Sequence, residues 1–514
     1  MPSLDELKSK WFIPMTGAGA DGVPTRRHSE DAGDNTLSVS TDGNTVTAMV
    51  DGQTYMQRWH DRLAALAGGT APELYHAGWR FEGVKTLGQV TGTSDALQDV
   101  DVADAAGIKT YVLTCRNAMV LAFNNASIIW LRANGVWTSC MDNRFPAGGS
   151  NHQKAAVHKD GAEAKAQLGS IDISKTRWDT TAHLATDPER NPTFGEPTHD
   201  TGVSIEGPAV TDIERSYRER WNDTSRSFGM DPLLPPQPLI STPLSSPPVG
   251  GSQSVQVLRT YGITNRLFGY SWSPRGEFTV WAAYLNAIKR ARSYIYIEDQ
   301  YFLPFGWPPC FDRPAGPARD TDIVFQLGEA MKHGVNVAVL TPSNAEDFTH
   351  IYQKYQRDLG VNYLTKIRAG GSPGDVVVAS LHNGGVDVYI HSKLMICDDE
   401  FVAIGSTNIG QRSMTHDGEL HVGVVDAANL FAKEFRKTLW GEHTGRPLAT
   451  LDDPAVAFSH FKSDTAASSG HLKPYPVDRD SVFPAVPGSK APPFGHVGTL
   501  TNIIDPYAGP AGLR

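Results

Sequence analysis

The chain has 514 residues, of which 40% are hydrophobic and 20% charged, as expected for a globular protein with a large buried core. Its formal net charge of −10 at pH 7 argues against a protein that mainly binds nucleic acid, since such proteins usually present a basic face. The four cysteines are too few and too widely spaced to predict a disulfide framework or a zinc site.

The N-terminal residues contain no apolar run of signal-peptide length, and the sequence contains no run of 18 apolar residues. We therefore expect a cytoplasmic protein, and leave open export by a route that reads no such signal. Residues 1–50 are assigned to an N-terminal extension.

Two stretches of the sequence repeat each other. GIKTYVLTCRN at 107–117 and GVNVAVLTPSN at 334–344 share Gly, Val, Leu, Thr and Asn at matching positions. Both follow a helix-compatible segment and have the apolar, β-rich character of a buried strand. Further segments match in the same order, namely 73–81 with 294–302 and 135–140 with 385–390. In each copy a His-x-Lys sequence follows the last of these segments. This order predicts a duplicated α/β unit, with helices covering both faces of a mixed sheet.

A proline-rich segment separates the copies. Residues 231–254 contain seven prolines, which exclude a regular helix or a central strand, so we predict a surface linker there. The first lobe is then 51–230 and the second 255–445, while 446–514 forms a Pro/Gly-rich tail without a core of its own. Apolar residues at helical spacing predict helices over 208–221, around 278–288 and over 427–440.

The strongest chemical signal is HSKLMICDDEFVAIGSTN at 391–408. It begins at the end of an alternating strand, VDVYI, and its Asp398-Asp399 pair predicts a turn into a second strand. Residues two apart on a strand share a face, so His391 and Lys393 point into one pocket. A neutral imidazole can attack phosphorus while an ammonium group neutralises the phosphate oxygens. Ser406 and Asn408 can donate hydrogen bonds to those oxygens without adding charge.

The first half carries a less regular copy, HQKAAVHKDGAEAKAQLGSID at 152–172. Five residues instead of four separate its lysine from Asp160, and eight instead of six separate Asp160 from the next Gly-Ser. The Asp160-Gly161 pair favours a hairpin turn, and a longer hairpin would absorb the difference. A carboxylate at Asp172, where the second copy has an asparagine, would repel phosphate unless it binds a lysine. The matching positions of this copy are His152, Lys154, Ser170 and Asp172.

Both strings resemble the HKD motifs of the phospholipase D superfamily. GSIDISKTRWDTTAH (169–183), IYIEDQYF (295–302) and IGSTNIGQRSMTHDGEL (404–420) resemble segments of the plant and eukaryotic-type phospholipases D. The likeness covers about residues 50–445. It implies an α/β fold with a duplicated phospholipase D-like unit. The two α/β/α lobes, each with a mixed sheet, would be related by pseudo-twofold symmetry, and one active site would lie between them.

The resemblance also implies roles for individual residues. His152 would become the phosphohistidine, and His391 would act as general acid and then base. Asp398 would orient His391, Asp160 would be its counterpart in the first motif, and Glu419 matches an acidic position that pairs with a motif histidine. The phosphate would be held by Lys154, Lys393 and Asn408.

We expect neither a metal nor any other cofactor, because His158, His199 and His416 near the motifs lack the spacing of a metal site. The expected activity is that of a monomeric phospholipase D at a phospholipid membrane surface. It would release phosphatidic acid and the head-group alcohol, use water or a small alcohol as acceptor, and bind no nucleic acid. Two alternatives remain: a nuclease or other non-lipid phosphodiesterase of the same superfamily, and a phospholipid-binding protein with impaired catalysis.

Overall fold

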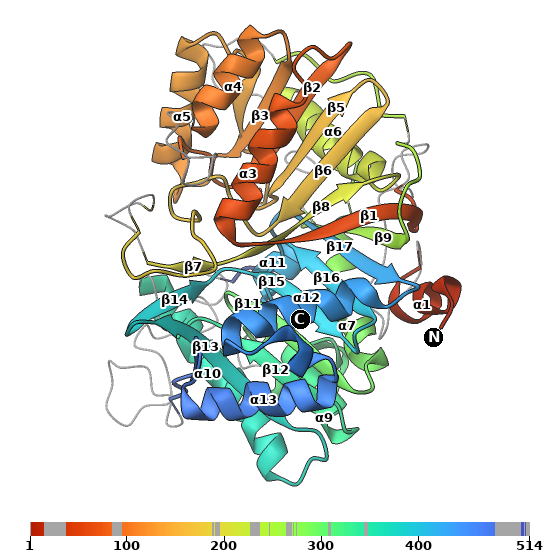
Figure 1. The fold of residues 1–514 in the computed structure, drawn as a ribbon, viewed down its shortest axis with the longest axis vertical. Helices are drawn as coiled ribbons and strands as arrows, with labels where there is room; N and C mark the ends of the chain where they lie inside the picture. Colours follow the sequence, from red (N-terminus) through yellow and green to blue (C-terminus); the bar gives the residue numbers. More distant parts are fainter. Residues whose placement is uncertain are drawn as a thin grey trace.

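Two mixed β-sheets, one in each half of the chain, form the framework of the protein (Figure 1). The strands of the first lobe lie side by side in the following order: β4 (Ser139–Asp142), β3 (Lys109–Cys115), β2 (Pro72–Gly78), β5 (Ala155–Asp160), β6 (Glu163–Gly169), β8 (Thr201–Glu206) and β1 (Thr41–Val50). The computed structural model describes residues 2–14, 37–84, 95–146, 148–187, 190, 196–226, 237–245, 247–263, 270, 272–273, 275–306, 310–343, 348–478, 505–507 and 509.

The second lobe repeats this order strand for strand. Its sheet consists of β13 (Val376–Asn383), β12 (Asn336–Leu340), β11 (Tyr294–Asp299), β15 (Lys393–Cys397), β16 (Phe401–Gly405), β17 (Glu419–Asp426) and β9 (Gln253–Tyr261). In both lobes the first three strands are parallel and the remaining neighbours antiparallel. The predicted duplication and the mixed α/β fold are therefore confirmed. Shorter strands add to the sheets: β7 (Thr198–His199), β10 (Glu277–Phe278), β14 (Val386–Ile390) and β18 (Leu472–Pro474).

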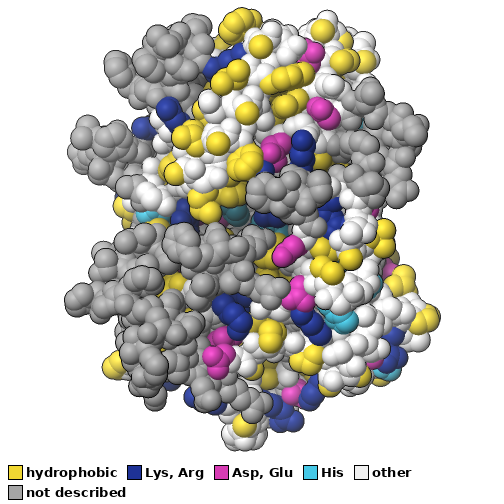
Figure 2. All heavy atoms as spheres, turned by 90° about the vertical axis from the view of Figure 1, so that its left-hand side faces the viewer, with side chains coloured by type: hydrophobic (Ala, Val, Ile, Leu, Met, Phe, Trp, Pro, Cys, Tyr) yellow, Lys and Arg dark blue, Asp and Glu magenta, His cyan; other side chains and the backbone are white. Residues whose placement is uncertain are grey.

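The helices repeat in the same way. In the first lobe the outer face of the sheet is covered by α3 (Asp51–Ala64), α4 (Ala96–Ala105) and α5 (Leu121–Ala133). In the second lobe the corresponding layer contains α7 (Thr279–Arg290), α9 (Ile323–Lys332) and α10 (Phe348–Ala369). Several large hydrophobic side chains around α4 and α5 are exposed, and Figure 2 shows hydrophobic side chains gathered over the upper lobe on one face of the molecule.

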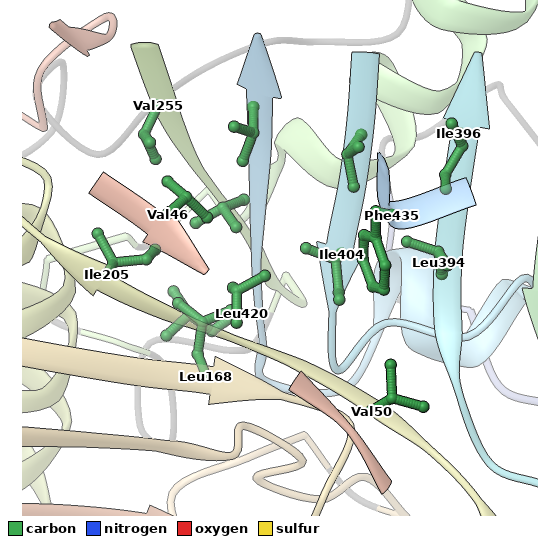
Figure 3. Packing of buried hydrophobic residues seen from close by; sticks show 14 of the residues in the cluster. Val46, Val50, Leu168, Ile205, Val255, Leu394, Ile396, Ile404, Leu420 and Phe435 are labelled. Carbon is green, nitrogen blue, oxygen red and sulfur yellow. The ribbon is translucent and has the colours of Figure 1, made fainter. Parts of the chain in front are cut away.

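The inner faces of the two sheets share one hydrophobic core, formed with α6 (Val210–Arg226), α12 (Leu430–Thr444) and α13 (Pro454–Ala467). Figure 3 shows residues of both lobes packed together there, including Leu168 and Ile205 from the first lobe and Ile404 and Leu420 from the second. Burying a side chain of this size contributes about 1.5–3 kcal/mol. The two lobes are therefore held against each other by their common core.

Two of the predicted boundaries are wrong. Residues 41–50 belong to no extension, because β1 pairs with β8 of the first lobe and with β9 of the second and so links the sheets. Residues 454–467 are no tail, because α13 contributes Ala457, Phe458 and Phe461 to the common core. Few prolines interrupt these segments, and their apolar residues are numerous enough to be buried.

The proline-rich linker is described in part. Residues 237–245 and 247–252 form neither helix nor strand, whereas residues 253–254, which the prediction included in the linker, begin β9. Ile240 and Leu244 reach the common core. Residues 231–236 and 246 lie outside the described part of the chain. The remaining elements are α1 (Leu4–Trp11), α8 (Pro317–Asp320), α11 (Gln411–Thr415) and the 3₁₀ turns Cys310–Asp312 and Leu448–Leu451. Among the described residues, no helix has the length and apolar character needed to cross a bilayer.

Candidate active site

The two His-x-Lys sequences occupy equivalent places at the junction of the sheets. Lys154 directly precedes β5, and Lys393 is the first residue of the equivalent strand β15. Each histidine is bound through its backbone to the opposite lobe: the N–H of His152 donates to the carbonyl of Gly418, and the N–H of His391 donates to the carbonyl of His199, both at 2.8 Å. One site is therefore built from both halves of the chain.

The imidazole of each motif histidine faces a carboxylate from the other lobe. Nδ1 of His152 lies 3.1 Å from both oxygens of Glu419, and Nδ1 of His391 lies 2.8 Å from Oδ2 of Asp200. An ionised carboxylate can only accept a hydrogen bond, so we assign the proton of each neutral ring to Nδ1. Nε2 of both histidines then keeps its lone pair for chemistry.

The motif serines hold these carboxylates. Ser406 donates to Oε2 of Glu419 at 2.5 Å, and Ser413 donates to Oε1 at 2.8 Å. Ser170 donates in the same way to Oδ1 of Asp200. A hydroxyl has a single proton to donate, and in this structure Ser170 and Ser406 donate theirs to these carboxylates, although the sequence predicted that they would hold phosphate. They orient the groups that orient the histidines.

The two lysines have different neighbours. Nζ of Lys154 lies 3.2 Å from Asp172 and 2.9 Å from the carbonyl oxygen of His152. Nζ of Lys393 donates to the amide oxygen of Gln300 at 2.9 Å and to the carbonyl of His391. Asp172 therefore binds a lysine, the condition under which a carboxylate is compatible with a phosphate site. The hydrogen-bond partners of Lys393 are neutral oxygens, in contrast to the carboxylate that faces Lys154.

Asn408, the counterpart of Asp172, is buried, and its Oδ1 makes no hydrogen bond to any described residue. The next residue, Ile409, donates its backbone N–H to Asp299 at 2.7 Å and so fixes this end of the motif. An asparagine amide in this place can donate to phosphate without adding charge.

Burial and clustered positive charges shift the pKa values in the site. Burial, followed by Lys154 and Lys393, lowers the pKa of His152 well below its usual value. For His391 the causes are burial and then the charges of Arg177, Lys393 and Lys154. Burial also lowers the pKa of Lys393 to about 7. Both imidazoles are therefore held neutral in a pocket whose positive potential favours an anion.

Burial acts on the carboxylates in the opposite sense. It raises the pKa of Glu419 to about 7 and that of Asp200 to about 6, although nearby lysines and serines oppose the shift. Both groups change their protonation state near neutral pH, where a proton-transferring site operates well. Perturbed pairs of this kind are concentrated at functional sites.

Two predicted site residues lie elsewhere. Asp160 is at the β5–β6 turn, where it accepts hydrogen bonds from the backbone of Thr70 and Ala71. Asp398 is at the β15–β16 turn and accepts from the backbone N–H groups of residues 292–294. The expected bond between Asp398 and His391 is therefore wrong, because the strand that starts at Lys393 carries Asp398 to its opposite end. The aspartates of both motifs hold hairpins in place.

Three residues of the site were not predicted from the sequence: Asp200, Gln300 and Arg177. Asp200 is the counterpart of Glu419, but it lies 30 residues after Ser170, whereas Glu419 lies 13 residues after Ser406. The longer segment in the first lobe hides the equivalence. The equivalence of the two carboxylates is still indicated in the sequence by the apolar segment that follows each of them, TGVSIE in the first lobe and LHVGVV in the second.

One further cluster of possible metal ligands includes His199, the residue before Asp200. Asp51, His183, His199 and Glu442 bring their ligand atoms within 4.8 Å of one another, and His199 also joins Glu298 and His443. None of these side chains belongs to either His-x-Lys motif.

Comparisons with known proteins agree with this geometry. The family model described as phospholipase D matches residues 183–334, and the model described as cardiolipin synthase, PLD-like domain, matches residues 284–440. Phospholipase D beta 1 of Arabidopsis thaliana is 26% identical over 464 residues, which cover 66% of this chain and 42% of that protein. Phospholipase D alpha 1 of Zea mays is 25% identical over 477 residues, covering 71% of this chain and 57% of that one.

A solved structure shares the fold. The phosphatidylserine synthase of Haemophilus influenzae Rd KW20 superposes with a TM-score of 0.51 and 11% sequence identity, over 77% of this chain and 85% of the other. The chain spans about half the length of the plant relatives that it matches.

Proposed function

Because this chain belongs to the phospholipase D superfamily of phosphodiesterases, we propose that it hydrolyses the distal phosphodiester bond of glycerophospholipids through a phosphohistidine. The products are phosphatidic acid and the head-group alcohol. One observation carries the proposal: two histidines at one site, each with Nδ1 held by a carboxylate of the opposite lobe. Such a pair supplies a nucleophile and a proton donor together.

In the first half of the reaction, Nε2 of His152 attacks phosphorus and the P–O bond to the head group breaks. His391, protonated in the substrate complex, gives its Nε2 proton to the leaving oxygen. Glu419 stabilises the positive charge that develops on His152 as the P–N bond forms. The bound phosphodiester anion offsets the positive charges that lower the pKa of His391 in the free protein, which favours the protonated form.

In the second half, His391 is neutral and removes a proton from a water or alcohol molecule. The acceptor oxygen attacks phosphorus, and the P–N bond to His152 breaks. Water yields phosphatidic acid, and a primary alcohol yields the phosphatidyl alcohol. Lys154, Lys393 and Asn408 hold the non-bridging oxygens through both steps, where fixed donors stabilise developing charge.

The surface supports a lipid substrate. Met119, Leu121, Ile129 and Trp137, on or beside α5, are 39–62% exposed. Aromatic and aliphatic side chains of this kind can enter the interfacial region of a bilayer. In Figure 2 the coloured part of the surface carries acidic and basic side chains side by side, in contrast to the basic stripe expected of a nucleic-acid-binding face. We expect the protein to act as a peripheral monomer, because both halves of the site belong to one chain.

The decisive experiment compares two substrates under one set of conditions. Phosphatidylcholine vesicles and plasmid DNA are each incubated with the protein and with a His152→Ala variant as control. We expect choline release from the vesicles, phosphatidylethanol when ethanol is added, and intact DNA. Nicked DNA without choline release would identify a nuclease, and binding of vesicles without turnover would identify an impaired enzyme.

The mechanism has its own test. The reaction of a substrate with a chiral phosphorothioate should proceed with retention, because two in-line displacements restore the configuration. Acid quenching and peptide mapping should place the phosphoryl group on His152. Inversion at phosphorus would contradict the covalent intermediate, and label on His391 would exchange the roles of the two histidines.

A further inference from the structure

A buried cluster of histidines and carboxylates joins the two lobes beside the proposed active site. It consists of Asp51 at the start of α3, His183 and His199 from the first lobe, and Glu442 from α12 of the second; we call it the His183 cluster. Both histidine side chains are fully buried, and those of Asp51 and Glu442 are 2% and 9% exposed. The proposed mechanism makes no use of this cluster.

The ligand atoms of the cluster are arranged as around one small cation. Nδ1 of His199 lies 3.3 Å from Asp51 and 3.1 Å from Glu442, while Nε2 of His183 lies 3.9 Å and 3.2 Å from the same two carboxylates. A tetrahedral zinc ion about 2.0–2.1 Å from each ligand would place neighbouring ligand atoms about 3.3–3.4 Å apart. Three of the four separations lie close to this value, and the longer one, 3.9 Å, joins His183 to the second oxygen of Asp51.

Hydrogen bonds account for only part of the arrangement, because Nε2 of His183 is hydrogen-bonded to Oε1 of Glu442 at 3.2 Å, whereas two other ligand atoms have no such partner among the described residues. Nδ1 of His199 and Oδ2 of Asp51 are buried and make no hydrogen bond to any residue in the described part of the chain, although carboxylate and imidazole atoms are close by. Each of these atoms has a lone pair directed into the cluster. Unsatisfied buried atoms of this kind are rare and costly unless an ion or water completes them.

The surroundings of both histidines match those of metal ligands. Nδ1 of His183 lies 3.3 Å from Asp179, and Nε2 of His199 lies 3.1 Å from Glu298. Each imidazole therefore turns one nitrogen to the cluster and the other to a carboxylate outside it. Metal-bound histidines almost always make this second contact, which fixes the tautomer and increases the basicity of the coordinating nitrogen.

We propose that the His183 cluster binds one divalent transition-metal ion, with zinc the best match to two imidazoles and two carboxylates at tetrahedral spacing. Calcium fits poorly, because it takes six to eight oxygen ligands. Four protein ligands leave no open position, so the ion is structural and takes no part in the phosphoryl transfer. A divalent cation also offsets the charges of the two buried carboxylates, which would otherwise be costly to bury.

The site would fix the position of Asp200. The backbone N–H of Asp51 donates to the carbonyl of Asp200 at 2.8 Å, and the N–H of Asp200 donates to Oδ1 of Asp51 at 3.2 Å. His199, the residue before Asp200, accepts the backbone hydrogen bond of His391. The equivalent acceptor in the other half of the site is Gly418, which has no side chain to bind an ion. The imidazole of His199 therefore has no counterpart at Gly418, and the proposed metal site lies beside only one half of the active site.

The test is the metal content and spectrum of the full-length protein. Purified protein should contain about one equivalent of zinc or another first-row divalent metal by mass spectrometry. After removal of the metal with a strong chelator, Co²⁺ should restore one equivalent and give the intense visible bands of a tetrahedral cobalt site. Metal removal should lower Tm, and reloading should restore it. Protein that remains metal-free and acquires no cobalt spectrum would overturn the proposal, and protonated histidines would then hold the carboxylates.

Variants locate the site. Asp179→Asn alters the outer contact of His183 and should weaken metal affinity about 10–100-fold. Asp179 also accepts hydrogen bonds from the backbone N–H groups of Thr180 and Thr198, so circular dichroism must show that the variant folds. His183→Ala should abolish the cobalt spectrum. His471→Gln is the matched control: its ring lies 6.2 Å from that of His183, but its Nδ1 contacts the carbonyl of His382. It should keep the full metal content. Loss of metal from His471→Gln but not from Asp179→Asn would place the ion elsewhere.

Discussion

Oδ2 of Asp200 lies 2.8 Å from Nδ1 of His391, although the two residues are 191 positions apart and belong to different lobes. The reciprocal contact, between Glu419 and His152, spans 267 positions. Among the described residues, each motif histidine is paired with a carboxylate of the opposite lobe. The proposed catalysis would therefore depend on the relative position of the two lobes as much as on the motifs themselves.

Replacing either carboxylate by its amide should reduce turnover strongly. We expect Glu419→Gln and Asp200→Asn to lower kcat on the order of 10²- to 10⁴-fold, because the amide no longer holds the imidazole in its reactive tautomer or stabilises its cationic form. Initial rates on a soluble phosphodiester measure this. Asp160→Asn is the matched control and should keep most of the activity, since Asp160 lies at the β5–β6 turn. Equal losses in all three variants would contradict the assignment.

The two lysine variants should be similarly inactive but differ in stability. Lys154→Ala and Lys393→Ala each remove a phosphate-holding charge, which costs about 2.7–4 kcal/mol of transition-state stabilisation, or roughly a hundred- to thousand-fold in rate. Lys154→Ala also leaves Asp172 buried without its cation, whereas Lys393→Ala leaves a neutral amide. Tm should therefore fall further in Lys154→Ala. Adding Asp172→Asn to that variant should restore Tm without restoring activity.

The alkaline limb of the pH profile should come from Lys393. Its pKa is lowered to about 7, so the ammonium form present below that pH is lost as pH rises through it. We expect kcat/KM on a soluble diester to decline above about pH 7, because this parameter reports ionisations of the free enzyme. In Lys393→Arg the guanidinium stays charged, and the decline should move to higher pH. Superimposable alkaline limbs would exclude Lys393 as their source.

Trp137 should affect turnover on membranes more than turnover in solution. Its side chain is 62% exposed beside α5, far more than a residue of the core. Burying a large apolar side chain contributes about 1.5–3 kcal/mol, so Trp137→Ser should weaken vesicle binding about tenfold or more. Sedimentation with phosphatidylcholine vesicles measures the binding. The rate on a short-chain soluble phosphodiester should be unchanged, and a parallel loss there would indicate misfolding rather than a membrane contact.

The repeated segments made the fold predictable. Strands β3 and β12 share a Val-Leu pair, and a glycine lies two residues before each strand, because the two strands occupy the same buried position in each sheet. The boundaries were less predictable, since β1 pairs with strands of both lobes and α13 packs into a core formed by residues far away in the chain. Those contacts leave no periodic signal in the segments themselves.

The site was predictable where chemistry and sequence spacing coincide. His152 and Lys154 lie just before β5, and His391 and Lys393 lie at the start of the equivalent strand β15. The position predicted for Asp398 was wrong, because strand β15 separates it from His391 and places the two residues at opposite ends of that strand. Asp200 and the His183 cluster were missed for the opposite reason. Their partners are distant in the chain, and only the packing of two lobes brings them within reach.

The exchange of carboxylates also bears on the ancestry of the chain. A single ancestral lobe would have carried one histidine and the carboxylate needed by another copy, so a twofold-symmetric dimer would have completed both pairs at once. Joining two such copies into one polypeptide freed them to diverge. The lysine of one lobe now faces Asp172 and that of the other faces Gln300, so the two histidines work in unlike electrostatic surroundings. Such a fusion would allow one histidine to act as nucleophile and the other as general acid and base, the division of roles that we propose.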